Sequence, residues 1–251
     1  MTLPLFYLAA EDGPLGQASG ITLTGSEARH AVGAMRLRPG DECYLADGRS
    51  RRAHVIITDV APDRLTAGVV EIVDVLPAPV RLVLVQALAK GERDEAAVEM
   101  ATELGVDEII PWQAERSIVQ WRGPRGERSR EKWAGVARAA AKQSRRTGIP
   151  VISALATTAY LAQRIGTAQL TLVLHEEAIE PLARVEVPAA GEVIVVVGPE
   201  GGVSPRDLEL LAAGGARSVR LGPLILRSSS AGPAALAVLN AKTRWLDEGL
   251  R

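Results

Sequence analysis

A glycine-rich turn, Gly198-Pro199-Glu200-Gly201-Gly202, is the part of this chain whose residue types and spacing best suit ligand binding. It follows an apolar run, Val193–Val197, that predicts a buried strand, and Ser204 after it is a candidate helix N-cap. In open α/β sheets, ligands bind beyond the carboxyl ends of the strands, and glycines let the backbone approach them closely. A plain tight turn has the same spacing, but Glu200 favours a binding loop because a carboxylate there needs a partner.

Two more predicted strands end in residues of this kind. A strand over Ser218–Leu221 ends at Leu221-Gly222-Pro223, and the apolar hook Leu224-Ile225-Leu226 then leads to Arg227. A strand over Leu170–Leu174 ends at His175-Glu176-Glu177. We expect the three loops to converge on one pocket. Its apolar walls and backbone groups would suit an adenine and a thioether better than a triphosphate.

Basic residues gather between positions 116 and 146, where ten Arg and Lys residues stand against two Glu residues. Trp121 and Trp133 lie in this segment, and basic residues interleaved with aromatic ones are typical of nucleic-acid binding. A solvated helix face produces a similar run of charge. We expect Gly123-Pro124-Arg125-Gly126 to form a flexible basic loop that orders on RNA.

Several other kinds of site are not expected. The chain has no P-loop motif, no G-x-G-x-x-G after its first predicted parallel strand and no G-x-S-x-G nucleophile elbow. His30, His54 and His175 are far apart in the sequence and have no cysteine cluster beside them, so no metal site is predicted.

The composition is that of a folded protein with a sizeable core, since 47% of the 251 residues are apolar, 24% are charged and the net charge is −1. The single cysteine, Cys43, cannot form an internal disulfide, and the sequence predicts neither a membrane span nor a signal peptide, so we expect a cytoplasmic location. Arginines make up 25 of the 29 basic residues. This bias suits phosphate recognition, and a GC-rich genome explains it equally well.

Residues 1–75 are expected to form a small β-barrel, because short, partly alternating apolar runs are separated by turns such as Asp47-Gly48. One helix is predicted at Ser26–Met35, with Ser26 as its N-cap. The predicted strands are Gly20–Leu23, Glu42–Ala46, Ala53–Val60 and Leu65–Val73.

After Pro77-Ala78-Pro79 the pattern changes to alternating strands and helices, which predicts a mostly parallel sheet covered by helices over residues 76–251. Further strands are predicted at Val80–Ala87 and Glu108–Pro111. Asp207 is expected in a capping box, and Ser228-Ser229-Ser230 is expected to cap the last helix. The predicted helices are Glu92–Leu104, Glu131–Ser144, Thr158–Ile165, Pro205–Ala213 and Gly232–Leu246.

These features together resemble a known family, the bacterial 16S ribosomal RNA uridine N3-methyltransferases of the SPOUT superfamily. The resemblance covers nearly the whole chain and includes the glycine-rich turn. Its other marks are His30 with Arg36-Leu37-Arg38 and Gly40-Asp41, Lys90-Gly91 with Glu103-Leu104-Gly105-Val106, Ala140-Ala141 with Gln143-Ser144 and Arg146, and Leu221-Gly222-Pro223 with Ile225-Leu226-Arg227.

The resemblance implies a SPOUT-type α/β domain with a deep trefoil knot, preceded by a PUA-like β-barrel that binds RNA. It also implies S-adenosylmethionine as the cofactor, a homodimer, and methylation of N3 of the uridine at position 1498 in the 16S rRNA of the 30S subunit. The sequence departs from the family at two positions, where Ser229 replaces a common glutamate and Leu224 replaces an arginine. A mechanism that needs either group is therefore not carried over.

The implied reaction gives roles to the loop residues. The uridine N3 must lose its proton, and Arg227 is the candidate cation that stabilises the charge on O2 or O4. Glu200 and Glu176 are candidate bases, and a water is an alternative. An Arg227–Glu200 pair that only holds the loops is a competing interpretation. The residues expected to line the cofactor pocket are Leu174, His175, Glu176, Gly198, Pro199, Glu200, Gly201, Gly202, Leu221, Gly222 and Leu226.

RNA recognition is assigned to both parts of the chain. The N3 atom lies on the Watson–Crick edge, so the target base must be unpaired or splayed out. Three rival functions stay open: ribose 2′-O-methylation, an RNA-binding assembly factor without catalysis, and a small-molecule α/β enzyme, which the basic segment disfavours. The residues expected to bind RNA are Arg36, Arg38, Arg122, Arg125, Arg138, Gln143 and Arg146.

Overall fold

The computed structural model describes residues 3–9, 12, 15 and 20–246. The chain divides into two compact units, one formed by Met1–Pro77 with Ala141–Ile149 and the other by Ala78–Ala140 with Pro150–Arg251. The sequence predicts a division near residue 76. It gives no sign that the chain returns to the first unit between residues 141 and 149, because that return depends on tertiary contacts.

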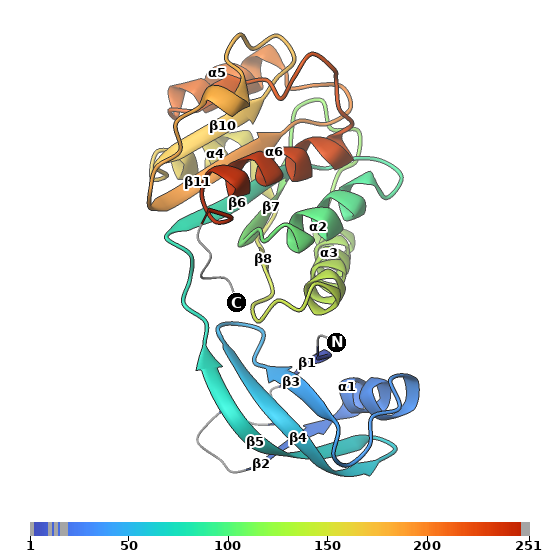
Figure 1. Cartoon of the computed structure of the whole chain (residues 1–251). Helices are drawn as coiled ribbons and strands as arrows, with labels where there is room; N and C mark the ends of the chain where they lie inside the picture. The colour runs from blue at the N-terminus through green and yellow to red at the C-terminus, as the bar shows by residue number, and fades with distance from the viewer. Residues whose placement is uncertain (1–2, 10–11, 13–14, 16–19, 247–251) are drawn as a thin grey trace. The chain divides into compact units, whose positions relative to one another are not determined.

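The first unit is built on a sheet that has five strands within the described residues, in the order β1-β3-β4-β5-β2 (Figure 1). The central strand β4 pairs antiparallel with β3 and β5, and β1 runs parallel to β3. Inward-facing side chains such as Leu23, Leu45 and Val55 are fully buried. The strands are β1 (Leu5–Tyr7), β2 (Gly20–Thr24), β3 (Glu42–Ala46), β4 (Arg51–Ala61) and β5 (Arg64–Asp74).

The helical segment of this unit differs from the single helix predicted. Helix α1 (Gly25–Arg29) continues into a π-helical turn, His30–Ala34. The predicted cap at Ser26 is wrong, because Thr24 occupies the N-cap position and its side chain makes no capping hydrogen bond. Fully buried Ala28 and Ala31 hold the segment against the sheet, and this packing sets its geometry.

The returning segment, Ala141–Ile149, completes the first unit. Lys142 Nζ pairs with Glu27 Oε2 at 2.8 Å and lies 4.8 Å from the centre of the Phe6 ring. The Tyr7 hydroxyl donates a hydrogen bond of 2.6 Å to the Arg146 carbonyl. Residues more than 100 positions apart in the sequence therefore pack together in the first unit.

The second unit is a parallel sheet, as the sequence predicts. Seven strands are seen in the described part of the chain, in the order β12-β10-β11-β6-β7-β8, with β9 also pairing with β7. The strands are β6 (Val80–Ala87), β7 (Glu108–Gln113), β8 (Val151–Ile152), β9 (Ala156–Thr157), β10 (Leu170–Leu174), β11 (Gly191–Val197) and β12 (Arg217–Val219).

Helices cover both faces of this sheet (Figure 1). Buried side chains of α2, α3 and α6 pack on one face, and those of α4 and α5 pack on the other. Within the described residues, no helix is long and apolar enough to cross a membrane. The helices are α2 (Arg93–Glu103), α3 (Gly123–Gln143), α4 (Thr158–Ile165), α5 (Pro205–Ala213) and α6 (Ser228–Lys242).

The predicted flexible loop at residues 123–126 is wrong, because these residues form the first turn of α3. The Trp121 and Trp133 rings meet edge to face with their centres 5.0 Å apart. Gly126 packs on Trp121 so closely that an added Cβ would lie 3.0 Å from Trp121 Cβ. Aromatic packing therefore orders a segment whose glycines and proline are typical of a loop.

Candidate functional site

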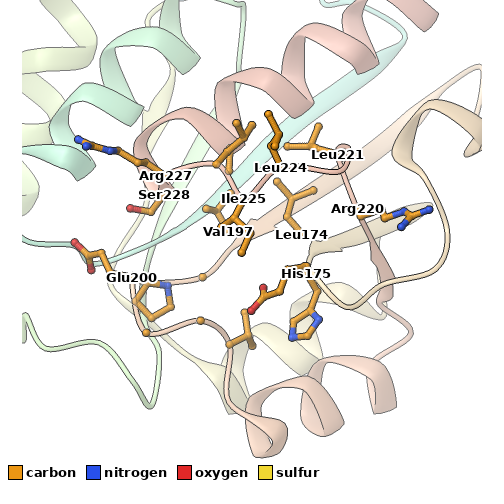
Figure 2. A pocket seen from close by; sticks show the side chains of 18 of the residues that line it. Leu174, His175, Val197, Glu200, Arg220, Leu221, Leu224, Ile225, Arg227 and Ser228 are labelled. Carbon is orange, nitrogen blue, oxygen red and sulfur yellow. The ribbon is translucent and has the colours of Figure 1, made fainter.

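The loops that follow β10, β11 and β12 line one pocket, together with the first turn of α6 (Figure 2). The expected convergence of these three loops is confirmed. The pocket has a volume of about 570 Å³, within the usual range for small-molecule sites. Leu174, Val197 and Leu221 form apolar walls. Each of the eleven residues that the sequence predicts for a cofactor pocket lines it, and so does Arg227.

The glycine-rich loop requires glycine at two positions, one for lack of space and one for its backbone conformation. A Cβ on Gly198 would lie 2.7 Å from Val203 Cγ2. Gly202 has a φ of +72°, in the left-handed region that favours glycine. Arg116 Nη1 donates a 3.0 Å hydrogen bond to the Gly201 carbonyl. The sequence places Arg116 in the basic segment, and only the tertiary structure shows that it fastens this loop.

The carboxylate of Glu200 is held by residues that follow strand β6. Its Oε1 accepts hydrogen bonds from the Lys90 backbone N–H at 3.1 Å and from Arg93 Nη1 at 3.2 Å. The alternative pairing with Arg227 is therefore wrong. Burial raises the pKa of Glu200, but the N–H groups of Glu200 and Lys90 and the charge of Arg93 outweigh it and lower the pKa overall. A carboxylate with a lowered pKa is a weaker base.

Arg227 stands at the start of α6, as its N-cap. Its backbone carbonyl accepts hydrogen bonds from Ser230 N and Ala231 N, each at 2.9 Å. Among the residues that the structure describes, none pairs with its exposed guanidinium. The expected capping of α6 by Ser228-Ser229-Ser230 is wrong, since the cap position lies one residue earlier and no side chain fills the capping role.

The two ends of the pocket differ in character. Figure 2 shows Arg227, Ser228 and Glu200 at one end, Arg220 and His175 at the other, and apolar side chains between them. A ligand with an apolar middle and polar groups toward both ends matches this distribution.

A buried network fixes the point where the glycine-rich loop enters α5. Ser204 caps the helix as predicted, because its Oγ accepts from Asp207 N at 3.1 Å. Asp207 does not complete a capping box. Its carboxylate instead accepts from Glu115 N at 3.0 Å and from Thr158 Oγ1 at 2.6 Å. The Trp112 indole N–H donates to Thr158 Oγ1 at 3.1 Å, so one carboxylate joins β7, α4 and α5.

Replacing Asp207 with alanine is expected to lower the free energy of unfolding by about 2–4 kcal/mol. Asp207 is 3% exposed, and its loss would leave the Glu115 N–H and the Thr158 hydroxyl without acceptors. Urea denaturation of Asp207→Ala and of the exposed control Glu209→Ala measures the effect. Equal stabilities for the two variants would show that the network does not hold the fold.

The residues predicted to bind RNA are not gathered in one unit. Arg36, Arg38, Gln143 and Arg146 belong to the first unit, whereas Arg122, Arg125 and Arg138 belong to the second. Arg122 and Arg125 are exposed around the first turn of α3. No group of three or more His, Cys, Asp or Glu residues that could hold a metal ion is found in the described part of the chain.

Comparison with known proteins decides the family. A family model described as an RNA methyltransferase domain matches residues 76–240, and one described as an RNA methyltransferase PUA domain matches residues 23–70. A protein of Mycobacterium tuberculosis named Ribosomal RNA small subunit methyltransferase E is 40% identical over 226 residues, which cover 88% of this chain and 86% of that protein. This chain belongs to the ribosomal RNA small subunit methyltransferase E family.

Other members of the methyltransferase E family match nearly the whole chain in sequence and in structure. The Bacillus subtilis protein of that name is 27% identical over 249 residues, covering 96% of this chain and 97% of that protein. A crystal structure of the Neisseria gonorrhoeae methyltransferase E bound to S-adenosylmethionine has a TM-score of 0.84 and 25% identity, covering 96% of this chain and 98% of that one. The predicted resemblance, the α/β fold and the PUA domain are thereby confirmed, and the chain is a methyltransferase.

Proposed function

We propose that this protein transfers the methyl group of S-adenosylmethionine to N3 of a uridine in the 16S rRNA of the small ribosomal subunit. The observation that carries the proposal is the pocket formed by three strand-end loops, with an apolar middle and, at one end, Arg227, which has no ion pair among the described residues. Relatives of this chain that are named Ribosomal RNA small subunit methyltransferase E support the choice of ribosomal RNA as the substrate.

The pocket residues fit S-adenosylmethionine. Leu174, Leu221 and Leu226 offer apolar surface to an adenosine, and the backbone at Gly198 and Gly202 can approach it because no Cβ intervenes. When bound, this cosubstrate supplies a methyl group on a positively charged sulfur, which leaves as a neutral thioether. The protein then needs chiefly to hold the nucleophile in line with that methyl group.

We propose that Arg227 stabilises the uracil after N3 has lost its proton. The N3 atom is protonated at neutral pH, and it attacks well only after this proton has gone to a base or to water. The negative charge then spreads over O2 and O4, and a guanidinium beside either oxygen stabilises it. Because Arg227 is exposed at the pocket and has no ion pair within the described residues, it is available for this role.

Replacing Glu200 with glutamine is expected to change kcat by less than about fivefold and to leave the shape of its pH profile between pH 6 and 9 unchanged. Glu200 is ionised throughout this range because its pKa is lowered, and its contacts fasten a loop. A partly exposed ion pair of this kind contributes little free energy. Loss of the acid limb of the pH profile in Glu200→Gln would instead identify Glu200 as the general base.

Binding of RNA is proposed to use basic residues of both units, with Arg36 and Arg38 in the first and Arg122 and Arg125 in the second. Contacts to phosphates release counterions, so affinity for the small subunit should fall steeply as salt is raised.

We also propose that the α/β domain contains a trefoil knot, that the protein is a homodimer and that it is located in the cytoplasm, as the family resemblance implies. Sedimentation at several protein concentrations tests the dimer.

The decisive experiment is methylation of small ribosomal subunits that lack the modification. Purified protein is incubated with them and labelled S-adenosylmethionine, and the RNA is digested for nucleoside mass spectrometry. We expect 3-methyluridine at a single site. A ribose-methylated nucleoside would contradict the N3 assignment while keeping the methyltransferase class, and no product despite cofactor binding would contradict the activity on this substrate.

A further inference from the structure

The first residue of α6 carries a buried hydroxyl without a partner. Ser228 is 8% exposed, lines the pocket, and its Oγ has no hydrogen bond within the described residues. Figure 2 shows Ser228 at the same end of the pocket as Arg227 and Glu200. A buried polar group that lacks a partner costs free energy, so a hydroxyl kept in this position is expected to meet one when the pocket is occupied.

The surroundings of this hydroxyl point to an anionic partner. Helix α6 is 15 residues long, and its N-terminus carries the partial positive charge of the helix dipole. In the described part of the chain, the N–H groups of Ser230 and Ala231 bond to the Arg227 carbonyl, and those of Ser228 and Ser229 have no acceptor. Arg227, the preceding residue, brings a full positive charge to the same end of the pocket. The Glu200 carboxylate at this end is already bonded to Lys90 and Arg93.

We propose that Ser228, with the N-terminus of α6, is an oxyanion-binding site of the reaction complex. The inference rests on the proposed function, which supplies two oxyanions: the carboxylate of the methionine part of S-adenosylmethionine, and the uracil oxygen that gains charge when N3 loses its proton. In both cases the Ser228 hydroxyl and the N–H groups of Ser228 and Ser229 donate to the oxygen. For the uracil oxygen, Arg227 also balances the charge.

The test compares Ser228→Ala and Ser228→Thr with the control Ser230→Ala, whose hydroxyl belongs to the same turn but does not line the pocket. Calorimetry measures the Kd of S-adenosylmethionine, of S-adenosylhomocysteine and of 5′-methylthioadenosine, which lacks the carboxylate. Single-turnover methylation of small subunits across a pH series measures the chemical step. The threonine variant keeps the hydroxyl and should restore most of what the alanine variant loses.

If the site binds the carboxylate, Ser228→Ala should weaken binding of the first two ligands by about tenfold or more, the value of one hydrogen bond to a charged group, and leave 5′-methylthioadenosine unchanged. If it binds the uracil, all three Kd values should stay and the single-turnover rate should fall at least tenfold, most at low pH. Binding and rates equal to those of Ser230→Ala would overturn the proposal.

Two further results distinguish failure of the oxyanion site from failure of the proposed function. The Tm of the ligand-free Ser228→Ala protein should not fall, because the hydroxyl has no partner in the protein. A clear drop would reveal an internal partner and overturn the proposal. Suppose that no RNA is methylated, but Ser228→Ala still weakens binding of S-adenosylhomocysteine and leaves binding of 5′-methylthioadenosine unchanged. The proposed function then fails and the oxyanion site stands.

Discussion

Arg227→Ala is expected to lower kcat by about 10²–10³-fold while the Kd of S-adenosylmethionine changes only slightly. This is the effect of removing one donor that stabilises charge developing in a transition state. The structure supports a role of this kind, since Arg227 lines the pocket and no ion-pair partner of its guanidinium is found among the described residues. Arg227→Lys should recover only part of the rate, because an ammonium keeps the charge and loses the planar fork.

Single-turnover kinetics and cofactor titration measure this prediction. Arg206→Ala is the matched control, since Arg206 is an exposed arginine of the same unit and lies outside the pocket. A weakened Kd with an unchanged rate in Arg227→Ala would contradict a role in the chemical step. That result would place Arg227 among the groups that hold the cofactor.

Gly198→Ala is expected to weaken cofactor binding by at least tenfold and to lower the free energy of unfolding by about 1–3 kcal/mol, the usual cost of an overpacked interior. The new Cβ would lie 2.7 Å from Val203 Cγ2 and 3.2 Å from Val203 N. Since the second of these atoms belongs to the backbone, the loop itself must shift. Calorimetric binding and thermal unfolding measure the two effects.

A double substitution separates crowding from other causes. Val203→Ala removes the nearer of the two clashing atoms, so Gly198→Ala combined with it should be less harmful than the sum of the single changes. Gly135→Ala is the control glycine, because a Cβ there meets nothing within 4 Å. Strictly additive losses in the double variant would show that the Val203 side chain is not the obstacle.

The sequence predicts best those elements whose evidence is local. The strand Val80–Ala87 and the helix Pro205–Ala213 have the predicted bounds, because the first is a continuous apolar run and the second has Ser204 and Pro205 at its start. The strand Leu5–Tyr7 was not predicted, since it is short and its pairing with β3 is its chief support.

In the site, too, features with local evidence could be predicted, and features that depend on tertiary contacts could not. The three loops could be predicted to converge because parallel strands end at one edge of a sheet. The partners of those loops could not be predicted, because Arg93 and Arg116 come from other elements and reach Glu200 and Gly201 only in the folded chain. The run Ser228-Ser229-Ser230 predicted a helix start, and only the structure shows that the Ser228 hydroxyl is buried with no hydrogen-bond partner among the described residues.

The return of the chain to the first unit has a consequence for synthesis of the protein. The Glu27–Lys142 pair and the Tyr7–Arg146 hydrogen bond cannot form until residue 146 has left the ribosome. Domains generally fold one after another from the N-terminus during translation. Here the N-terminal unit must wait, incomplete, while more than half of the chain is made, and its last contacts form only after the first strands of the second unit have already emerged.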